Sequence, residues 1–368
     1  MKITFPHMGT MSIPVKAMLR ELGLDVVEPP PITSRTIALG VQHSPEYACL
    51  PLKINVGNFL EAIEKGADTI AMLGGVGPCR FGYYGQVERE ILRDLGFKGD
   101  FIIIEPPQGR ISDFVYRLHK AFPNVSAVTA LRGVRFGWEK LKAVDTMERE
   151  LLKIRPYESK KGEATEIYNS VLRELDEASS IKNVRNILKK GLNQLKDLKK
   201  EKSDKIKPLK VALIGEIYLM LEPYSNLDTA RILGELGVEV TKTEYLTDYV
   251  LLNIFKFKGM RDLKRLARPY LKNEIGGHGI NSVANAVKYS KLGYDGIVHI
   301  FPFTCMPEIV AQGILHKISE DFGIPIISLS FDEHSGKAGL QTRLEAFVDL
   351  LERRREKEAK LSEGLSWN

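Results

Sequence analysis

The strongest constraint on the fold of this chain is a repeat within its own sequence. The segment LRELGLDVV at 19–27 is similar to LGELGVEVT at 233–241. A short apolar stretch precedes each copy: KITF at 2–5 and KVALI at 210–214. Each copy predicts a strand, a helix and a second strand. The glycine shared by the two copies, Gly23 and Gly237, suits the left-handed turn that ends a helix.

The repeat extends beyond this first unit. Two further pairs of similar segments follow in the same order: NFLEAIEKGADTIAML at 58–73 with ANAVKYSKLGYDGIVHI at 284–300, and ILRDLGFKGDFIII at 91–104 with ISEDFGIPIISLS at 318–330. Helices that alternate with apolar strands are typical of parallel sheets covered by helices on both faces. The sequence therefore predicts an α/β protein with two similar Rossmann-like domains in tandem.

The expected boundaries follow from this repeat and from a charged segment between its copies. We expect a first α/β domain at 1–145 with Cys49 and Cys79, a helical linker at 146–206, and a second α/β domain at 207–368 with Cys305 and a C-terminal helix. Residues 151–206 hold 14 Lys and Arg against 9 Asp and Glu. Apolar residues recur there at steps of three or four, which indicates one long amphipathic helix. Aromatic residues do not alternate regularly with its charges, so a solvated helix face is favoured over nucleic-acid binding.

Composition excludes several other classes of protein. The chain has three cysteines in 368 residues, an odd number that fits no disulfide framework. No apolar run approaches the roughly 20 residues that span a bilayer, and the N-terminus lacks a secretory signal. We expect a cytoplasmic protein whose thiols are either core residues or ligands.

The positions of the cysteines favour ligands. Each lies within two residues of a proline: Cys49 precedes Leu50-Pro51, Cys79 follows Pro78, and Cys305 precedes Met306-Pro307. Cysteine–proline neighbours recur at iron–sulfur sites. Cys79 and Cys305 also follow apolar strands and precede helices expected at about Gln86–Leu95 and Pro307–Phe322. The positive end of a helix favours a thiolate and a negatively charged cluster.

Three interpretations of the cysteines remain open from their spacing. An iron–sulfur cluster on three thiolates uses all of them and leaves one iron open. A zinc site would add His278 as a fourth ligand, although the chain has no close CxxC pair. Cysteines buried only for packing are the third interpretation.

His278 is the main candidate for a catalytic residue. It lies in GGHG at 276–279, where the second copy of the repeat matches the position of Cys49. A histidine there could serve as a ligand, as a proton donor or only as a helix cap. Further candidates flank the cysteines or follow the last strand, where they could equally be caps or packing residues: Glu46, Lys53, Tyr83, Tyr84, Asp332, Glu333, His334 and Arg343. The loop GEIYLMLEPYSN at 215–226 is expected to open toward the same cleft.

Four motifs in order resemble those of a known family. They are CLPLKINVGNF, GPCRFGYYGQ, FPFTCMPE and FDEHSGKAGLQTRLEAFVDLL, and the resemblance spans the chain from Lys2 to about Leu351. The chain resembles proteins related to the 2-hydroxyacyl-CoA dehydratases and their activases. The resemblance implies a 4Fe–4S cluster with Cys49, Cys79 and Cys305 as ligands, and a double-cubane cluster only if ligands are shared between subunits.

The resemblance also implies partners and a reaction. It implies a dimer, a separate ATP-dependent activator that delivers low-potential electrons, and an acyl-CoA or other small substrate that is reduced or reductively dehydrated. The chain lacks the GxxxxGK[ST] phosphate loop, so we expect it to accept electrons rather than hydrolyse ATP. A cluster-bearing electron relay or scaffold without its own substrate, or a zinc or structural protein, remains the alternative.

Overall fold

Two four-stranded parallel sheets form the framework of the protein. The computed structural model describes residues 1–74, 79–105, 122, 125–200, 207–253, 259–273 and 275–365. The strands are β1 (Lys2–Thr4), β2 (Asp25–Val26), β3 (Thr69–Leu73), β4 (Asp100–Ile104), β5 (Leu209–Gly215), β6 (Val238–Lys242), β7 (Gly296–Pro302) and β8 (Ile326–Phe331). The first sheet has the order β2-β1-β3-β4 and the second the order β6-β5-β7-β8, with every pairing parallel. The predicted fold class is thus confirmed, and the two sheets repeat one topology.

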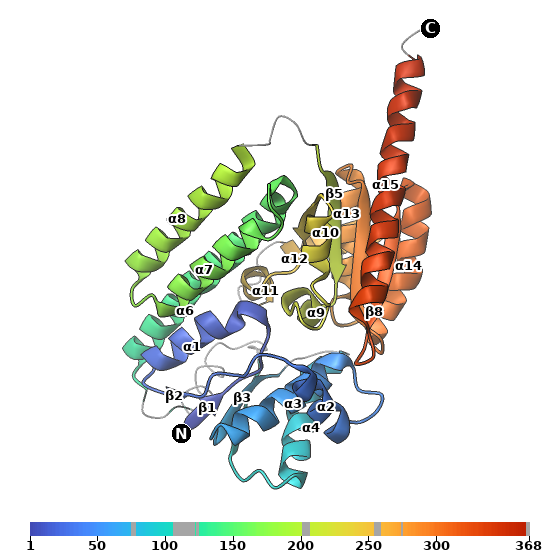
Figure 1. Cartoon of the computed structure of the whole chain (residues 1–368). Coiled ribbons are helices and arrows are strands. Elements are labelled where there is room, and N and C mark those ends of the chain that lie inside the picture. Colours follow the sequence, from blue (N-terminus) through green and yellow to red (C-terminus); the bar gives the residue numbers. More distant parts are fainter. Residues whose placement is uncertain are drawn as a thin grey trace.

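The helices complete this repeat. In the first half they are α1 (Ser12–Glu21), α2 (Ser34–His43), α3 (Leu50–Glu64) and α4 (Phe81–Asp94). In the second half they are α9 (Ile217–Leu221), α10 (Thr229–Glu235), α11 (Leu246–Asn253), α12 (Gly259–Ala267), α13 (Gly279–Lys291), α14 (Met306–Phe322) and α15 (Lys337–Leu365). In both halves a helix precedes the third strand and another follows it, namely α3 and α4 around β3, and α13 and α14 around β7 (Figure 1).

The two matched glycines end their helices as the repeat predicts. Gly23 has a φ of 77° and Gly237 a φ of 85°. A residue with a Cβ atom rarely adopts this left-handed conformation, whereas glycine does so without a steric penalty.

The helix after Cys79 begins earlier than predicted. We expected it at about Gln86, but α4 begins at Phe81. Glycine weakens helix propensity, which hid this first turn from sequence reasoning. A Cβ atom on Gly85 would lie 3.3 Å from a side-chain carbon of Ile103, so the glycine lets α4 pack closely on the first sheet.

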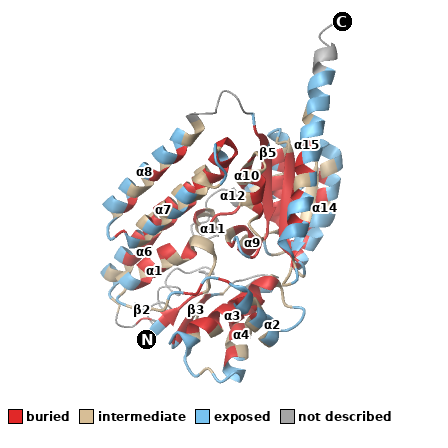
Figure 2. Ribbon diagram, in the orientation of Figure 1, coloured by how far each residue is buried: buried red, intermediate tan, exposed pale blue. Residues whose placement is uncertain are grey.

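The segment between the sheets is a packed helical layer. It consists of α6 (Ala127–Ile154), a short 3-10 turn (Arg155–Tyr157), α7 (Glu163–Glu177) and α8 (Ile181–Lys200). The predicted boundary at 145/146 falls inside α6. The single long helix was also wrong, because Ser180 accepts a hydrogen bond from the amide of Asn183 at 3.2 Å and begins a new helix, α8. The apolar positions of α7 and α8 form one core with α1 and α6 (Figure 2).

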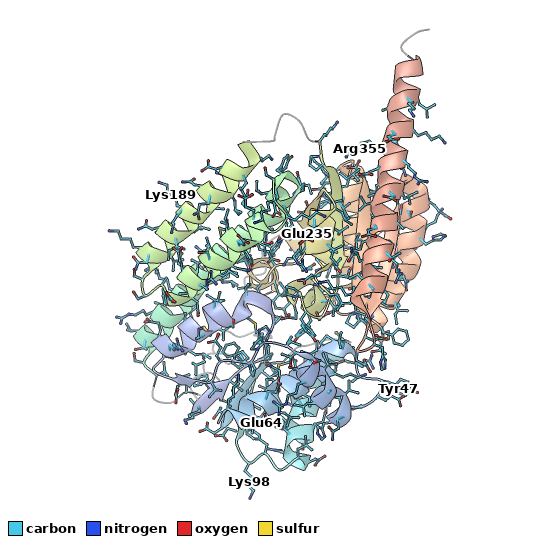
Figure 3. The ribbon with its side chains drawn as sticks, viewed as in Figure 1. Tyr47, Glu64, Lys98, Lys189, Glu235 and Arg355 are labelled. Atoms are coloured by element: carbon cyan, nitrogen blue, oxygen red, sulfur yellow. The ribbon has the colours of Figure 1, made fainter. Side chains whose placement is uncertain are left out.

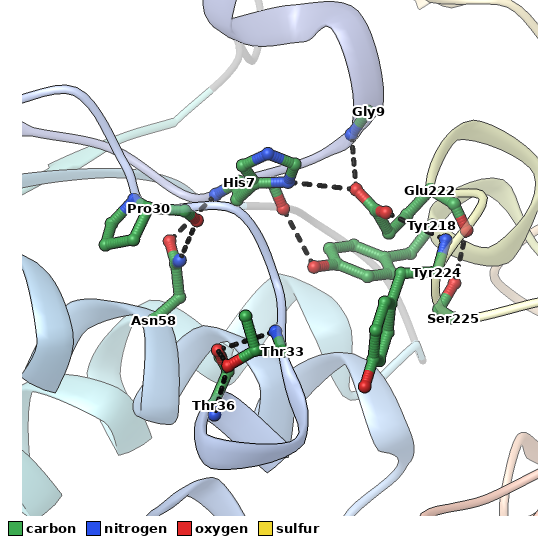
Figure 4. A network of polar contacts seen from close by, with 10 residues as sticks. All are labelled: His7, Gly9, Pro30, Thr33, Thr36, Asn58, Tyr218, Glu222, Tyr224 and Ser225. Carbon is green, nitrogen blue, oxygen red and sulfur yellow. Dashed lines mark hydrogen bonds and ion pairs between the residues drawn. The ribbon is translucent and has the colours of Figure 1, made fainter.

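Polar contacts and a shared core join the two halves. Glu222, which follows α9, accepts hydrogen bonds from the amide of Gly9 at 2.5 Å and lies 3.0 Å from Nδ1 of His7 (Figure 4). The hydroxyl of Tyr218 donates to the carbonyl oxygen of His7 at 2.8 Å. Ile32, Leu50 and Ile54 of the first half belong to the same hydrophobic core as β5 and α9. The carboxyl end of the first sheet is therefore held against the second half.

Candidate functional site

All three cysteines lie at helix N-termini. Cys49 is the N-cap of α3 and Cys305 the N-cap of α14, while Cys79 directly precedes Arg80, the N-cap of α4. β3 and β7 hold matching places in their sheets, and Cys79 and Cys305 follow them in the chain. Pro51 and Pro307 occupy the first turns of their helices, where the missing amide hydrogen costs nothing. Helix initiation therefore accounts for the prolines that follow Cys49 and Cys305. The third pair cannot be compared in this way, because Pro78 lies outside the described residues.

One arginine ties the three cysteine-bearing segments together. Arg80, next to Cys79, donates from Nη1 to the carbonyl oxygen of Tyr47 at 3.3 Å and from Nη2 to that of Thr304 at 2.5 Å. Tyr47 lies two residues before Cys49, and Thr304 directly precedes Cys305. The side chain of Arg80 thus spans from one cysteine loop to the other two.

Further contacts place the sulfur atoms in one region. Sγ of Cys49 lies 2.6 Å from the hydroxyl of Tyr84, on α4 five residues after Cys79. A Cβ atom on Gly277 would lie 3.5 Å from Sγ of Cys79 and 3.1 Å from Cγ of Pro307. The GGHG loop therefore packs against both Cys79 and the start of α14. We call the group of Cys49, Cys79 and Cys305 the cysteine site.

Burial dominates the electrostatics of the thiols. It raises the pKa of Cys49 from 9.0 to about 12, with the carboxylate of Glu216 acting in the same direction. The pKa of Cys305 is raised still further, again by burial first and then by Glu216 and Glu308. We expected the helix ends to favour thiolates, but that effect is worth ~0.3–1 kcal/mol, whereas three pKa units correspond to ~4 kcal/mol. The thiols of Cys49 and Cys305 are therefore protonated at neutral pH.

Three buried carboxyl groups at the edge of the second sheet escaped sequence reasoning. Glu216 follows β5, Glu244 lies two residues after β6, and Glu308 lies in the first turn of α14 after β7. Their exposed fractions are 8%, 4% and 0%. Burial raises the pKa of Glu216 to about 7 and that of Glu244 to about 8. Glu216 and Glu244 can therefore hold or release protons near neutral pH.

Glu308 is the most deeply buried of the three. Its Oε2 lies 2.9 Å from Nε2 of His299, whose Nδ1 lies 3.1 Å from the hydroxyl of Ser328. Its Oε1 has no hydrogen-bond partner among the described residues. Such an unsatisfied buried oxygen costs about 1–3 kcal/mol and marks a place where a ligand or water could bind.

His278 occupies the place in the second half that Cys49 has in the first. It is the N-cap of α13, as Cys49 is the N-cap of α3. Its Nε2 lies 3.9 Å from Oε2 of Glu244, whose Oε1 accepts a hydrogen bond from Asn281 at 3.3 Å. Burial lowers the pKa of His278, so its ring is neutral at neutral pH. The side chain forms no capping hydrogen bond, which leaves a role beyond capping open.

The other candidate residues from the sequence mostly make structural contacts. Glu333 accepts a hydrogen bond from Lys53 at 2.5 Å and so joins the two halves. Asp332 caps its own turn, accepting from the amide of His334 and the hydroxyl of Ser335. Arg343 donates to the carbonyl oxygen of Ser328 at 3.4 Å. The side chains of Glu46 and His334 are exposed.

A collar of exposed apolar side chains flanks the cysteine site. Each of its members lies within four residues of a cysteine: Tyr47 (76% exposed), Tyr83 (67%), Phe303 (61%) and Met306 (54%). Tyr47 projects outward from the molecule in Figure 3. Aromatic and methionine side chains are enriched at protein interfaces.

Fold and site together define an α/β protein of two parallel sheets with three cysteines gathered at helix N-termini. No protein-family model matches the chain, and no curated protein has a similar sequence. Among the described residues, no group of three His, Cys, Asp or Glu side chains is placed to hold a single metal ion. No described helix is long and apolar enough to cross a membrane.

Proposed function

We propose that this chain is a cytoplasmic iron–sulfur protein similar to components of the 2-hydroxyacyl-CoA dehydratases. Cys49, Cys79 and Cys305 would hold one 4Fe–4S cluster. A separate ATP-dependent activator would deliver low-potential electrons, and the chain would use them to reduce or reductively dehydrate a small substrate such as an acyl-CoA. The observation that carries this proposal is the contact of Arg80 with the backbone beside both Cys49 and Cys305.

The donor set suits a cubane better than a single metal ion. In a cubane each thiolate binds a different iron, so the three sulfurs need not meet at one point. Zinc would need three cysteines and His278 to converge on one ion, and the described residues offer no such group. Gly277 has no Cβ atom, which lets the GGHG loop approach Sγ of Cys79 and the ring of Pro307 closely. When bound, the cluster would supply electrons one at a time.

The protein's own residues would supply protons and orientation. Glu216 and Glu244, with pKa values of about 7 and 8, can each donate a proton at neutral pH. Nε2 of the neutral His278 ring lies 3.9 Å from Oε2 of Glu244, which Asn281 positions through a hydrogen bond. The collar around the cysteine site is a surface on which an activator or a second copy of the chain could dock.

Metal analysis tests the proposal directly. Protein purified without oxygen is expected to contain about four irons and four sulfides per chain, the content of one cubane. Iron, acid-labile sulfide and electron paramagnetic resonance spectra would be measured on the same preparation. One zinc per chain without sulfide would overturn the proposal.

A variant of His278 separates an enzyme from an electron relay. An enzyme needs a group that acts on the substrate, whereas a relay needs only the cluster and a docking surface. We expect His278→Ala to keep its iron but to change the spectrum or turnover of the protein, because the ring lies beside Glu244 in the interior. Asn285→Ala on the same helix serves as the control. Complete loss of iron would make His278 a ligand, and wild-type spectrum and turnover would make it a bystander.

A further inference from the structure

The last strand of the second sheet has an open edge. β8 lies at the end of the order β6-β5-β7-β8, so it pairs with another strand on one side only (Figure 1). The amide of Ile297 donates to the carbonyl oxygen of Pro325 at 3.0 Å. Further along, the amide of Phe303 donates to the carbonyl oxygen of Phe331 at 2.9 Å. In a parallel ladder with this register, the backbone groups of every second residue of β8 face away from β7. The residues that face outward are Ile326, Ser328 and Ser330.

The outward backbone groups of β8 are almost all unpaired. The carbonyl oxygen of Ser328 accepts one long hydrogen bond, at 3.4 Å from Nη2 of Arg343. Among the described residues, no other hydrogen bond reaches the outward amides and carbonyl oxygens of Ile326, Ser328 and Ser330. Ser330 is exposed, and Ile326 and Ser328 are half-buried. Another strand could therefore approach this edge.

β8 also lacks the features that protect other sheet edges. Proteins usually protect an edge strand by making it very short, by placing charges or proline in it, or by covering it. At the other edges, β2 has only two residues, and α6 packs against β6 with an ion pair between its Glu148 and Lys242. β8 has six residues, IISLSF, with no charge and no proline. Its edge is thus suited to pair with a further strand.

An exposed apolar side chain of α15 lies beside this edge. Arg343 of α15 reaches Ser328, and Nη2 of Arg354 lies 3.9 Å from where a Cβ atom on Gly323 would be, just before β8. Leu350 lies between the two arginines, two helical turns after Arg343 and so on the same side of α15. Its side chain is 53% exposed. A chain that pairs with β8 would come close to this leucine.

We propose that β8 pairs with β8 of a second copy of this chain, antiparallel and about a two-fold axis beside Ser328. Opposite residues of an antiparallel ladder exchange two hydrogen bonds at every second position. Ser328 would face Ser328 of the partner subunit, and Ile326 would face Ser330 of the partner subunit. Because Ile326 and Ser330 are equally far from Ser328 in the strand, all outward groups find partners, as a two-fold interface requires. This self-complementarity favours a second copy over a strand of another protein. The inference does not depend on the proposed function.

A proline at an outward position of β8 tests the dimer. Ser330→Pro removes an outward amide and leaves the hydrogen bonds to β7 in place, because residue 330 does not face β7. We expect it to raise the dissociation constant of the dimer at least tenfold, measured by analytical ultracentrifugation of the full chain as purified. Ser330→Ala keeps the amide and serves as the control, expected to stay within twofold of the wild type. Circular dichroism shows whether each variant is folded.

An introduced cysteine tests the two-fold axis independently of the proline variant. Opposite residues of a hydrogen-bonded antiparallel pair have Cα atoms about 5.5 Å apart, a separation that a disulfide spans. Under oxidising conditions, Ser328→Cys is therefore expected to form more covalent dimer than the wild type does. Ser330→Cys is the matched control. It is expected to form no more than the wild type, because the two copies of residue 330 would lie four positions out of register.

Three results would overturn this inference. They are a wild-type chain that stays monomeric at high micromolar concentration, a dimer that a folded Ser330→Pro variant leaves unchanged, and cross-linking through Ser330→Cys but not through Ser328→Cys. None of these measurements depends on iron content. A chain without a cluster would leave the β8 dimer standing, and a monomeric chain would leave the cysteine site untouched.

Discussion

Replacing any one of Cys49, Cys79 and Cys305 by alanine is expected to abolish cluster binding. Three thiolates are the fewest that the proposal allows, so two would leave half of the irons without a protein ligand. Iron and sulfide should fall from about four of each per chain to near zero. Both would be measured after reconstitution without oxygen, beside electron paramagnetic resonance spectra of the wild type.

Two controls separate loss of a ligand from loss of the fold. Tyr84→Phe removes the hydroxyl that contacts Cys49 but keeps the ring, so we expect nearly normal iron content. Circular dichroism should show that each cysteine variant keeps its helices, because the three largest hydrophobic clusters of the described residues contain none of the cysteines. A Cys79→Ala protein that still holds four irons would show that the cysteine site is not the ligand set.

The repeat carried most of the information about the fold. Similar segments in the same order require similar units, and the two sheets do share one strand order. The same alignment placed His278 opposite Cys49, and both prove to be N-caps of corresponding helices. These correspondences can be read from the sequence because the starts of helices and the glycine turns that end them depend on local backbone chemistry.

The features that sequence reasoning missed depend on tertiary contacts. Glu216, Glu244 and Glu308 each follow a different strand, so no spacing links them in the chain. A glutamate buried beside a sheet cannot be told from a surface glutamate by its neighbours in sequence. The loop at 215–226, which contains Glu216, was expected to open toward the cleft. That expectation was the only sequence signal that pointed to Glu216. Similarly, the contacts of Arg80 join residues that are more than 200 positions apart.

The buried carboxyl group of Glu88 predicts that the stability of the fold depends on pH. Glu88 on α4 is 0% exposed, and burial raises its pKa from 4.5 to about 8. Its Oε1 accepts a hydrogen bond from Asn55 at 3.0 Å, but Oε2 of Glu88 and Oδ1 of Asn55 have no partner among the described residues. Both atoms are acceptors while Glu88 is ionised. Protonation turns Oε2 into a donor, the kind of group that Oδ1 of Asn55 lacks.

We therefore expect Glu88→Gln to stabilise the protein at alkaline pH. The folded chain binds the proton of the Glu88 carboxyl group more tightly than the unfolded chain does. The stabilisation that this proton provides is therefore complete below about pH 4.5 and is lost as the pH rises through about 8. The free energy of unfolding should fall by ~1.4 kcal/mol per pH unit in this window, or ~5 kcal/mol in all. Glutamine is neutral throughout, so the free energy of unfolding of the variant should match that of the wild type near pH 5 and exceed it by several kcal/mol at pH 8.

Urea unfolding at pH 5, 6.5 and 8 measures this difference, with Glu90→Gln on the exposed side of α4 as the control. Glu216 and Glu244 titrate alike in both proteins, so parallel curves for the wild type and Glu88→Gln would show that Glu88 is ionised in the folded state.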